Sequence, residues 1–130
     1  MAICLTIHFL KRVLETLFLH KYSTKVNYSV GAFIGVYYTL VSWIILHFNK
    51  LAEVGLPGGP KESILGVLLF AFGEAGNFYH HYLLARLRRE KGGVDQKYLV
   101  PEGGLFSWGN GVTCPHYLFE LLAWLGISLI

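Results

Sequence analysis

The polar residues that could carry chemistry in this 130-residue chain lie within or beside apolar stretches. Asn77, His81 and Arg88 are separated by four and seven positions, and Glu74 stands three before Asn77, so all four fall roughly on one helical face. An amide, an imidazole and a guanidinium in a row suit a long polyanionic ligand, because arginine makes bidentate contacts with phosphate. The same pattern also fits arginines that only anchor a helix end in the cytosol. From spacing alone, this second interpretation is preferred.

A second group of ionisable residues interrupts the first apolar stretch. His8 and Arg12 are four positions apart, and Arg12 and Glu15 are three apart, so they share a face. One interpretation is that Lys11 extends its ammonium group towards water while Arg12 pairs with Glu15 inside a helical bundle. The other is that Arg12 lines a polar pocket for an anionic ligand. Both remain open at this point.

A third group surrounds the start of the last apolar stretch. The pair Gly103–Gly104 predicts a tight turn, and glycine there would let the backbone approach a ligand closely. Pro115 suits the first turn of a helix. His116 and Glu120 are four positions apart and face the same way. A helix N-terminus with a histidine beside it favours an anion.

The composition indicates what must position these residues. Hydrophobic residues make up 54% and charged residues only 15%, against about 45–50% and roughly 25% in soluble domains. Disorder is excluded by this balance. A nucleic-acid partner is also excluded, because the net charge is only +3 and no dense basic stripe appears. Cys4 and Cys114 are interpreted as small buried hydrophobes rather than a disulfide. The expected class is a membrane protein of one domain at most.

Apolar stretches define four expected helices. Val30 to Phe48 is nineteen residues without aspartate, glutamate, lysine or arginine, enough to cross the hydrocarbon core. Gly31 and Gly35 have a GxxxG spacing that would let another helix approach. The last stretch is still apolar at Ile130, and its fourteen residues from Tyr117 are too few to span. We therefore expect a truncated product or fragment. The other stretches run from Ala2 to Leu19, from Ile64 to Leu84 and from Tyr117 onward.

The loops between these stretches suggest an orientation. His20–Ser29 and Arg86–Glu102 are rich in lysine and arginine, whereas Asn49–Glu62 is neutral and contains a Gly/Pro-rich helix breaker. Two basic loops on one side agree with four spans, and the positive-inside rule places them in the cytosol. The fold class expected is an all-α, multi-span membrane bundle.

Four segments together resemble a known family: HFLKRVLETLFLHKYS, GNFYHHYLLARLR, KYLVPEGGLF and CPHYLFELLAW, in that order. The pattern is similar to the C-terminal domain of the steroid 5-alpha-reductase family, especially plant members and the related trans-2-enoyl-CoA reductases. The resemblance implies a multi-pass oxidoreductase of lipid or steroid metabolism in the endoplasmic reticulum membrane, with a bundle of about seven spans. Residues 1–62 would form two membrane helices with their loop, and 63–130 the reductase-like C-terminal domain, cut short at its C-terminal end.

The resemblance also implies a reaction and a cofactor. The family uses NADPH to reduce a carbon–carbon double bond conjugated to a carbonyl, while an acidic group stabilises the developing enolate. The substrate would be a hydrophobic enone of steroid, enoyl-CoA or polyprenal type. The acid–tyrosine pair that engages its carbonyl would lie in upstream helices outside this sequence. The implied cofactor-binding residues, bordered by the glycine turn, are Arg12, Asn77, His81, Arg88, Tyr98, His116 and Glu120.

Departures from the family pattern leave alternatives open. His81 replaces an acid of the steroid-reducing members, and residues 107–111 look like an insertion that could displace His116. A di-iron hydroxylase is disfavoured because Asn77 stands where a histidine box would begin and the chain has only six histidines. No metal site is therefore expected. The remaining alternative is a catalytically inactive membrane fragment or interaction protein.

Overall fold

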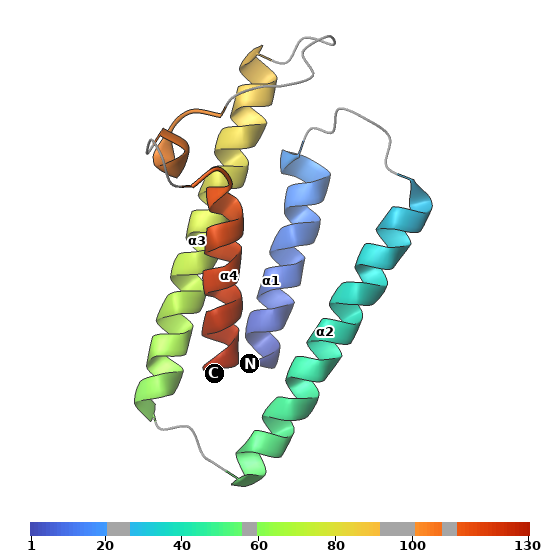
Figure 1. The fold of residues 1–130 in the computed structure, drawn as a ribbon, viewed down its shortest axis with the longest axis vertical. Coiled ribbons are helices and arrows are strands. Elements are labelled where there is room, and N and C mark those ends of the chain that lie inside the picture. The colour runs from blue at the N-terminus through green and yellow to red at the C-terminus, as the bar shows by residue number, and fades with distance from the viewer. Residues whose placement is uncertain (21–26, 56–59, 92–100, 108–111) are drawn as a thin grey trace.

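The computed structural model describes residues 1–20, 27–55, 60–91, 101–107 and 112–130, and its secondary structure within these ranges is entirely helical. Four long helices lie side by side with both chain termini at the same end, and α2 diverges from the other three at one end (Figure 1). The all-α class is thereby confirmed. The elements are α1 (Ala2–Leu14), the π-helix η1 (Glu15–Leu19), α2 (Tyr28–Gly55), α3 (Pro60–Lys91), the 3₁₀ helix η2 (Gly104–Ser107) and α4 (Pro115–Ser128).

Helices α3 and α4 form the tightest interface, and small residues make it possible. A Cβ atom added to Gly73 would stand 2.4 Å from the backbone nitrogen of Ala123, and one added to Gly126 would stand 2.4 Å from that of Phe70. Close approach through small residues is typical of helices in membranes. The predicted GxxxG pair does not make this contact, since a Cβ on Gly31 or Gly35 would meet nothing within 4 Å in the part of the chain that the structure describes.

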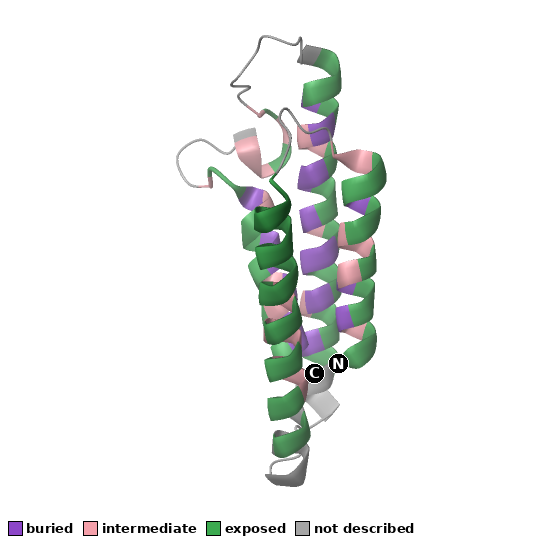
Figure 2. Cartoon of the chain, turned by 90° about the vertical axis from the view of Figure 1, so that its right-hand side faces the viewer, coloured by how far each residue is buried: buried purple, intermediate pink, exposed green. Residues whose placement is uncertain are grey.

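Figure 2 shows buried residues along α3 and on α1, whereas the described part of α2 is mostly exposed. Helix α4 also buries Phe119, Ala123 and Ile127. Among the described residues, the buried apolar side chains that cluster together are Leu5, Phe70, Ala123 and Ile127. Large apolar side chains instead cover much of the outer surface, for example Phe18 and Ile3 at 75% exposure each. Large exposed apolar patches on a protein surface mark sites that contact a membrane, a ligand or another protein.

One helix among the described residues is long and apolar enough to cross a membrane. It is the segment Tyr28–Phe48 of α2, 21 residues with a mean hydropathy of 1.8 and none of that apolar window buried against the rest of the chain. It contains Val30–Phe48, the stretch that the sequence predicts to be long enough to cross the hydrocarbon core. By length and composition alone, the other three helices do not pass the same test.

Several predicted boundaries need correction. Helix α3 continues to Lys91, so Arg86 and Arg88 are helical instead of lying in a loop. The helical i,i+4 ion pair between Arg86 Nε and Glu90 Oε1, 2.7 Å long, is consistent with that extension. The expected neutral loop is also shorter, since α2 runs to Gly55 and α3 begins at Pro60. A second correction concerns the thiols: both are free, as expected, but Cys114 is exposed and Cys4 only half-buried.

Candidate functional site

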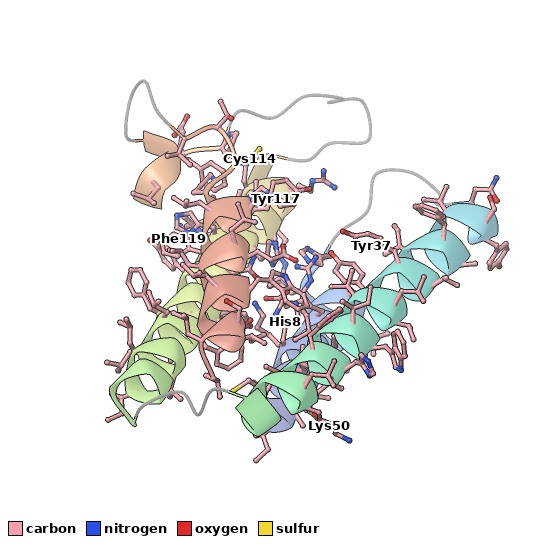
Figure 3. The ribbon with its side chains drawn as sticks, turned by 60° about the horizontal axis from the view of Figure 1, so that its bottom comes forward. His8, Tyr37, Lys50, Cys114, Tyr117 and Phe119 are labelled. Atoms are coloured by element: carbon pink, nitrogen blue, oxygen red, sulfur yellow. The ribbon has the colours of Figure 1, made fainter. Side chains whose placement is uncertain are left out.

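Polar side chains gather in the interior between α1, η1, α3 and the start of α4. Burying ionisable groups is costly unless they are paired. Asn77 and His8 are each only 1% exposed, and Glu15 is 2% exposed. Figure 3 shows this concentration of nitrogen and oxygen atoms near His8, between the helices. The buried polar cluster, as we call it, comprises His8, Lys11, Arg12, Glu15, Glu74, Asn77, His81 and His116.

Lys11 occupies the centre of the buried polar cluster. Its Nζ donates a hydrogen bond of 2.5 Å to Asn77 Oδ1. The same nitrogen lies 3.0 Å from Glu74 Oε2 and 3.5 Å from Glu15 Oε1. The prediction that Lys11 extends towards water was therefore wrong. Two carboxylates and an amide hold the ammonium group inside the molecule instead, which offsets its desolvation.

The structure contains the ion pair that one interpretation gave to Arg12, whereas the other, a polar pocket for an anionic ligand, stays a prediction. Its Nη1 lies 3.4 Å from Glu15 Oε2, which confirms the predicted pair. The same nitrogen is 3.3 Å from each ring nitrogen of His81, and Nδ1 of that imidazole is 3.0 Å from Glu15 Oε2. Arg12 also lines a groove between α1 and α2. It thus belongs to a packed ion pair and to a pocket wall at once.

Asn77 ties three helices together. Its Oδ1 accepts from Lys11 of α1, and its Nδ2 donates to the backbone carbonyl of His116 on α4 at 2.8 Å. The His116 ring lies 5.4 Å from the His81 ring, and its buried Nδ1 has no hydrogen-bond partner in the described part of the chain. Burial, together with the positive charges of the nearby His81 and Arg12, lowers the pKa of His116 from 6.5 to about 4. His116 precedes the apolar stretch that starts at Tyr117 and is neutral near pH 7.

The predicted glycine turn closes over one face of α3. Gly103 and Gly104 have φ angles of 91° and 52°, in the left-handed region that favours glycine. The Leu105 backbone N–H donates to His80 Nε2 at 3.2 Å, and His80 Nδ1 donates to the Gly76 carbonyl at 2.7 Å. A Cβ on Gly104 would stand 2.9 Å from His80 Nε2. The close backbone approach predicted for these glycines is therefore made to the protein's own His80.

Only some of the predicted cofactor-binding residues lie together in the structure. Arg12, Asn77, His81 and His116 come together in the buried polar cluster. Arg88 is exposed on the last turns of α3. Tyr98 and positions 108–111 of the suspected insertion lie outside the described residues. Glu120 follows His116 by one helical turn but lines a different surface, the groove between α4 and α2.

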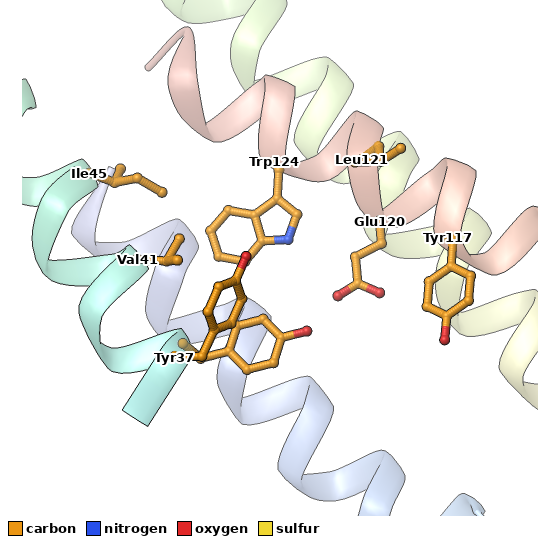
Figure 4. Close-up of a pocket in the computed structure, with 8 residues that line it drawn as sticks. Tyr37, Val41, Ile45, Tyr117, Glu120, Leu121 and Trp124 are labelled. Carbon is orange, nitrogen blue, oxygen red and sulfur yellow. The ribbon is translucent and has the colours of Figure 1, made fainter. Parts of the chain in front are cut away.

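Two apolar grooves flank α2 and share Tyr38. The larger, about 470 Å³, lies between α2 and α4 and contains Tyr37, Tyr38, Glu120 and Trp124 in its wall (Figure 4). The smaller, about 300 Å³, lies between α1 and α2 and includes His8, Arg12 and Tyr38. Both volumes fall within the range of small-molecule sites. The smaller groove borders the buried polar cluster directly.

A possible metal-ligand set also occurs within the described residues. Glu15, His20 and His81 offer ligand atoms that all lie within 4.8 Å of one another. The guanidinium of Arg12 approaches Glu15 Oε2 and the His81 ring to 3.3–3.4 Å, however, so a positive charge already neutralises this carboxylate. A divalent ion would have to displace Arg12 first.

Sequence reasoning missed the roles of Lys11 and Glu74 as central members of the buried polar cluster. The local signal was present, because Lys11 stands four residues before Glu15 and three after His8 on one face of α1. No local signal indicated that Glu74 and Asn77 are partners of Lys11. Lys11 and Asn77 are separated by 66 positions. Their pairing depends on how α1 packs against α3, which no local pattern specifies.

Comparison with known proteins identifies the family. The model of the family described as 3-oxo-5-alpha-steroid 4-dehydrogenase matches residues 31–130. The chain belongs to this family. The match covers all of α3 and α4, which confirms the resemblance noted in the sequence.

Curated relatives of the chain are reductases. It is 33% identical over 97% of its length to a polyprenal reductase of Xenopus laevis, of which it covers 42%. It is 29% identical over 98% of its length to a very-long-chain enoyl-CoA reductase of Dictyostelium discoideum, of which it covers 41%. The chain thus spans about two fifths of the length of these relatives. No solved structure matches it significantly.

Proposed function

We propose that this chain forms the cofactor-binding part of a membrane reductase that uses NADPH to saturate a carbon–carbon double bond conjugated to a carbonyl. The observation that carries the proposal is the buried polar cluster. Arg12, Asn77, His81 and His116, expected at a cofactor site from the family resemblance, lie together there. Two relatives that span the whole chain are reductases of a polyprenal and of an enoyl-CoA.

The residues present fit a polyanionic dinucleotide. His116 Nδ1 is a buried polar atom without a hydrogen-bond partner in the described ranges, which a ligand could satisfy. The side chain of Arg12 is 31% exposed, and Arg88 is exposed on α3, where its charge lowers the pKa of His20, so both guanidinium groups can meet phosphate. NADPH, when bound, supplies the hydride. Tyr98 and Glu120 complete the proposed cofactor set.

Each proposed role of this chain's residues follows from its surroundings. Asn77, held by Lys11 and the His116 carbonyl, fixes the distances between α1, α3 and α4 at the site. Burial keeps His116 neutral near pH 7. An uncharged imidazole can accept or donate a hydrogen bond with little reorganisation. The pairing of Arg12 with Glu15 keeps its guanidinium at the wall of the smaller groove.

We further propose that the site works inside a multi-span bundle of the endoplasmic reticulum membrane. The exposed apolar span of α2 and the apolar outer surfaces of α1 and α3 support this proposal. Residues 1–62 would supply two membrane helices and 63–130 the C-terminal reductase domain. The two apolar grooves beside α2 would admit a hydrophobic enone of polyprenal, enoyl-CoA or steroid type.

The experiment is a cofactor-oxidation assay in membranes. Membranes that contain the chain would be mixed with NADPH and a panel of one polyprenal, one long-chain trans-2-enoyl-CoA and one 3-oxo-4-ene steroid, beside empty membranes. We expect loss of NADPH absorbance together with the saturated product from at least one substrate. Absence of product with all three would favour the alternative, a catalytically inactive membrane fragment or interaction protein.

A further inference from the structure

His8 is a buried histidine with only one of its two ring nitrogens hydrogen-bonded within the described residues. It is 1% exposed, and its Nδ1 lies 2.6 Å from Glu74 Oε1. Its other ring nitrogen, Nε2, is buried without a hydrogen-bond partner in the described part of the chain. A buried polar atom normally has a hydrogen-bond partner, so His8 Nε2 is available to a bound ligand.

The bond to Glu74 determines which nitrogen of His8 is available. Because a carboxylate accepts but does not donate, Nδ1 carries the proton of this hydrogen bond and Nε2 is the atom that gains or loses a proton. The second carboxylate oxygen of Glu74 is held at 3.0 Å by Lys11 Nζ, so the carboxylate cannot rotate freely. A carboxylate that orients an imidazole in this way is the arrangement of general acid–base catalysis.

His8 also lines the smaller groove, between α1 and α2. Apart from His8, Arg12 and Thr16, this wall consists of apolar and aromatic side chains, including Phe9 and Ile34. Phe9 and Trp124 pack their rings against the His8 ring at 5.2 and 4.9 Å. An acid–base group in an apolar groove suits a substrate that is itself apolar around the reacting carbons.

We propose that His8 is a catalytic residue of the reduction, the acid that protonates the α-carbon of the substrate, with Glu74 as its positioning residue. The inference rests on the proposed function, because it assumes an enone in the smaller groove. After the β-carbon has gained a hydride, the substrate is an enolate. The Nε2–H bond of the His8 imidazolium then breaks as the enolate electron pair forms a C–H bond at the α-carbon. The carbonyl is restored, and the neutral imidazole regains a proton from water.

The reverse proton transfer provides a test that needs no cofactor. Membranes containing the chain would be incubated in D₂O with a saturated long-chain acyl-CoA and no NADPH, and deuterium at the α-carbon would be measured by mass spectrometry. We expect His8 to catalyse this exchange, and His8→Gln to slow it by about a hundredfold, within the range of general acid–base catalysis. His47→Gln is the matched control, since His47 is exposed on α2 and stacks on Trp43; its exchange rate should equal that of the unmodified chain.

Glu74→Gln tests the positioning role separately. The amide can still hydrogen-bond the His8 ring but lacks the negative charge that stabilises the imidazolium. We expect the exchange rate to fall by about tenfold and its pH profile to move to lower pH, whereas a merely structural change would lower the rate at all pH values alike. Helix content measured by circular dichroism would show that both variants are folded. A misfolded His8→Gln variant leaves the Glu74→Gln profile to decide.

The outcomes separate this proposal from the proposed function. Unchanged exchange in folded His8→Gln overturns the role of His8. Reduction of enones with NADPH by a chain that catalyses no exchange also overturns it, while the proposed function stands. Exchange that depends on His8, without any NADPH-dependent reduction, supports His8 and refutes the proposed function. A chain that shows neither reaction refutes both.

Discussion

Lys11 and Asn77 are joined by a hydrogen bond of 2.5 Å across the α1–α3 interface, although 66 positions separate them in the chain. The same lysine nitrogen meets carboxylates from η1 and α3. The contacts of Asn77 continue to α4 through the His116 carbonyl. Lys11 and Asn77 thus connect α1, η1, α3 and α4, the elements that surround the buried polar cluster.

Lys11→Met should destabilise the bundle strongly. The substitution keeps an unbranched side chain but leaves Glu74 and Glu15 without their shared cation. Removing one partner of a buried ion pair typically costs about 3–5 kcal/mol. We expect a loss of this size in the free energy of unfolding, measured by denaturant titration in detergent micelles. Lys50→Met, at an exposed position of α2, is the control and should change the stability little. Equal stability of both variants would contradict the central role of Lys11.

Gly73→Leu should force α3 and α4 apart. Even a Cβ atom there would lie 2.4 Å from the Ala123 backbone nitrogen, so a larger side chain cannot be accommodated without movement of a helix. Overpacking of this kind costs at least about 1–3 kcal/mol. The measurement is the thermal midpoint followed by circular dichroism. Gly35→Leu serves as the comparison, because a Cβ at Gly35 meets nothing within 4 Å, and its midpoint should stay close to that of the unmodified chain.

Arg88→Ala should weaken NADPH binding if the proposed function is right. A hydrogen bond to a charged group contributes about 1.5–3 kcal/mol, so the dissociation constant should rise by about tenfold or more. Binding would be followed by quenching of intrinsic tryptophan fluorescence. Arg89→Ala, at the next exposed position of the same helix, should leave the affinity nearly unchanged. An unaltered dissociation constant for Arg88→Ala would remove this residue from the cofactor site.

The stability of the chain should fall between about pH 6.5 and about pH 4 because of His116. Its pKa is lowered from 6.5 to about 4 in the folded state. The unfolded chain therefore binds more protons within this window, and stability is lost as the pH falls through it. Burial lowers the pKa of His20 as well, which acts in the same direction. His116→Asn should flatten the dependence of the unfolding midpoint on pH, whereas His47→Asn should preserve it. An identical pH dependence in His116→Asn would disprove the assignment.

The sequence by itself was sufficient for the all-α class and the family. Long apolar runs predict helices, because that property depends on composition and local periodicity alone. Pro115 at the start of α4 and the glycine turn at Gly103–Gly104 were also predictable, since proline and glycine restrict or release the backbone locally. The pair Arg12–Glu15 follows from a spacing of three on one helix.

Only the tertiary structure decided which polar groups meet. One interpretation of the sequence had Lys11 reach water, yet α3 brings Glu74 and Asn77 to it. The GxxxG pair lay on α2, yet the close helix contact uses Gly73 and Gly126. In both cases the decisive partner lies on another helix, and the choice of partner depends on how whole helix faces fit together. A local pattern specifies which residues lie on the same face of one helix. The free energy of burying a charge or filling a gap depends also on the residues of the helix that packs against that face.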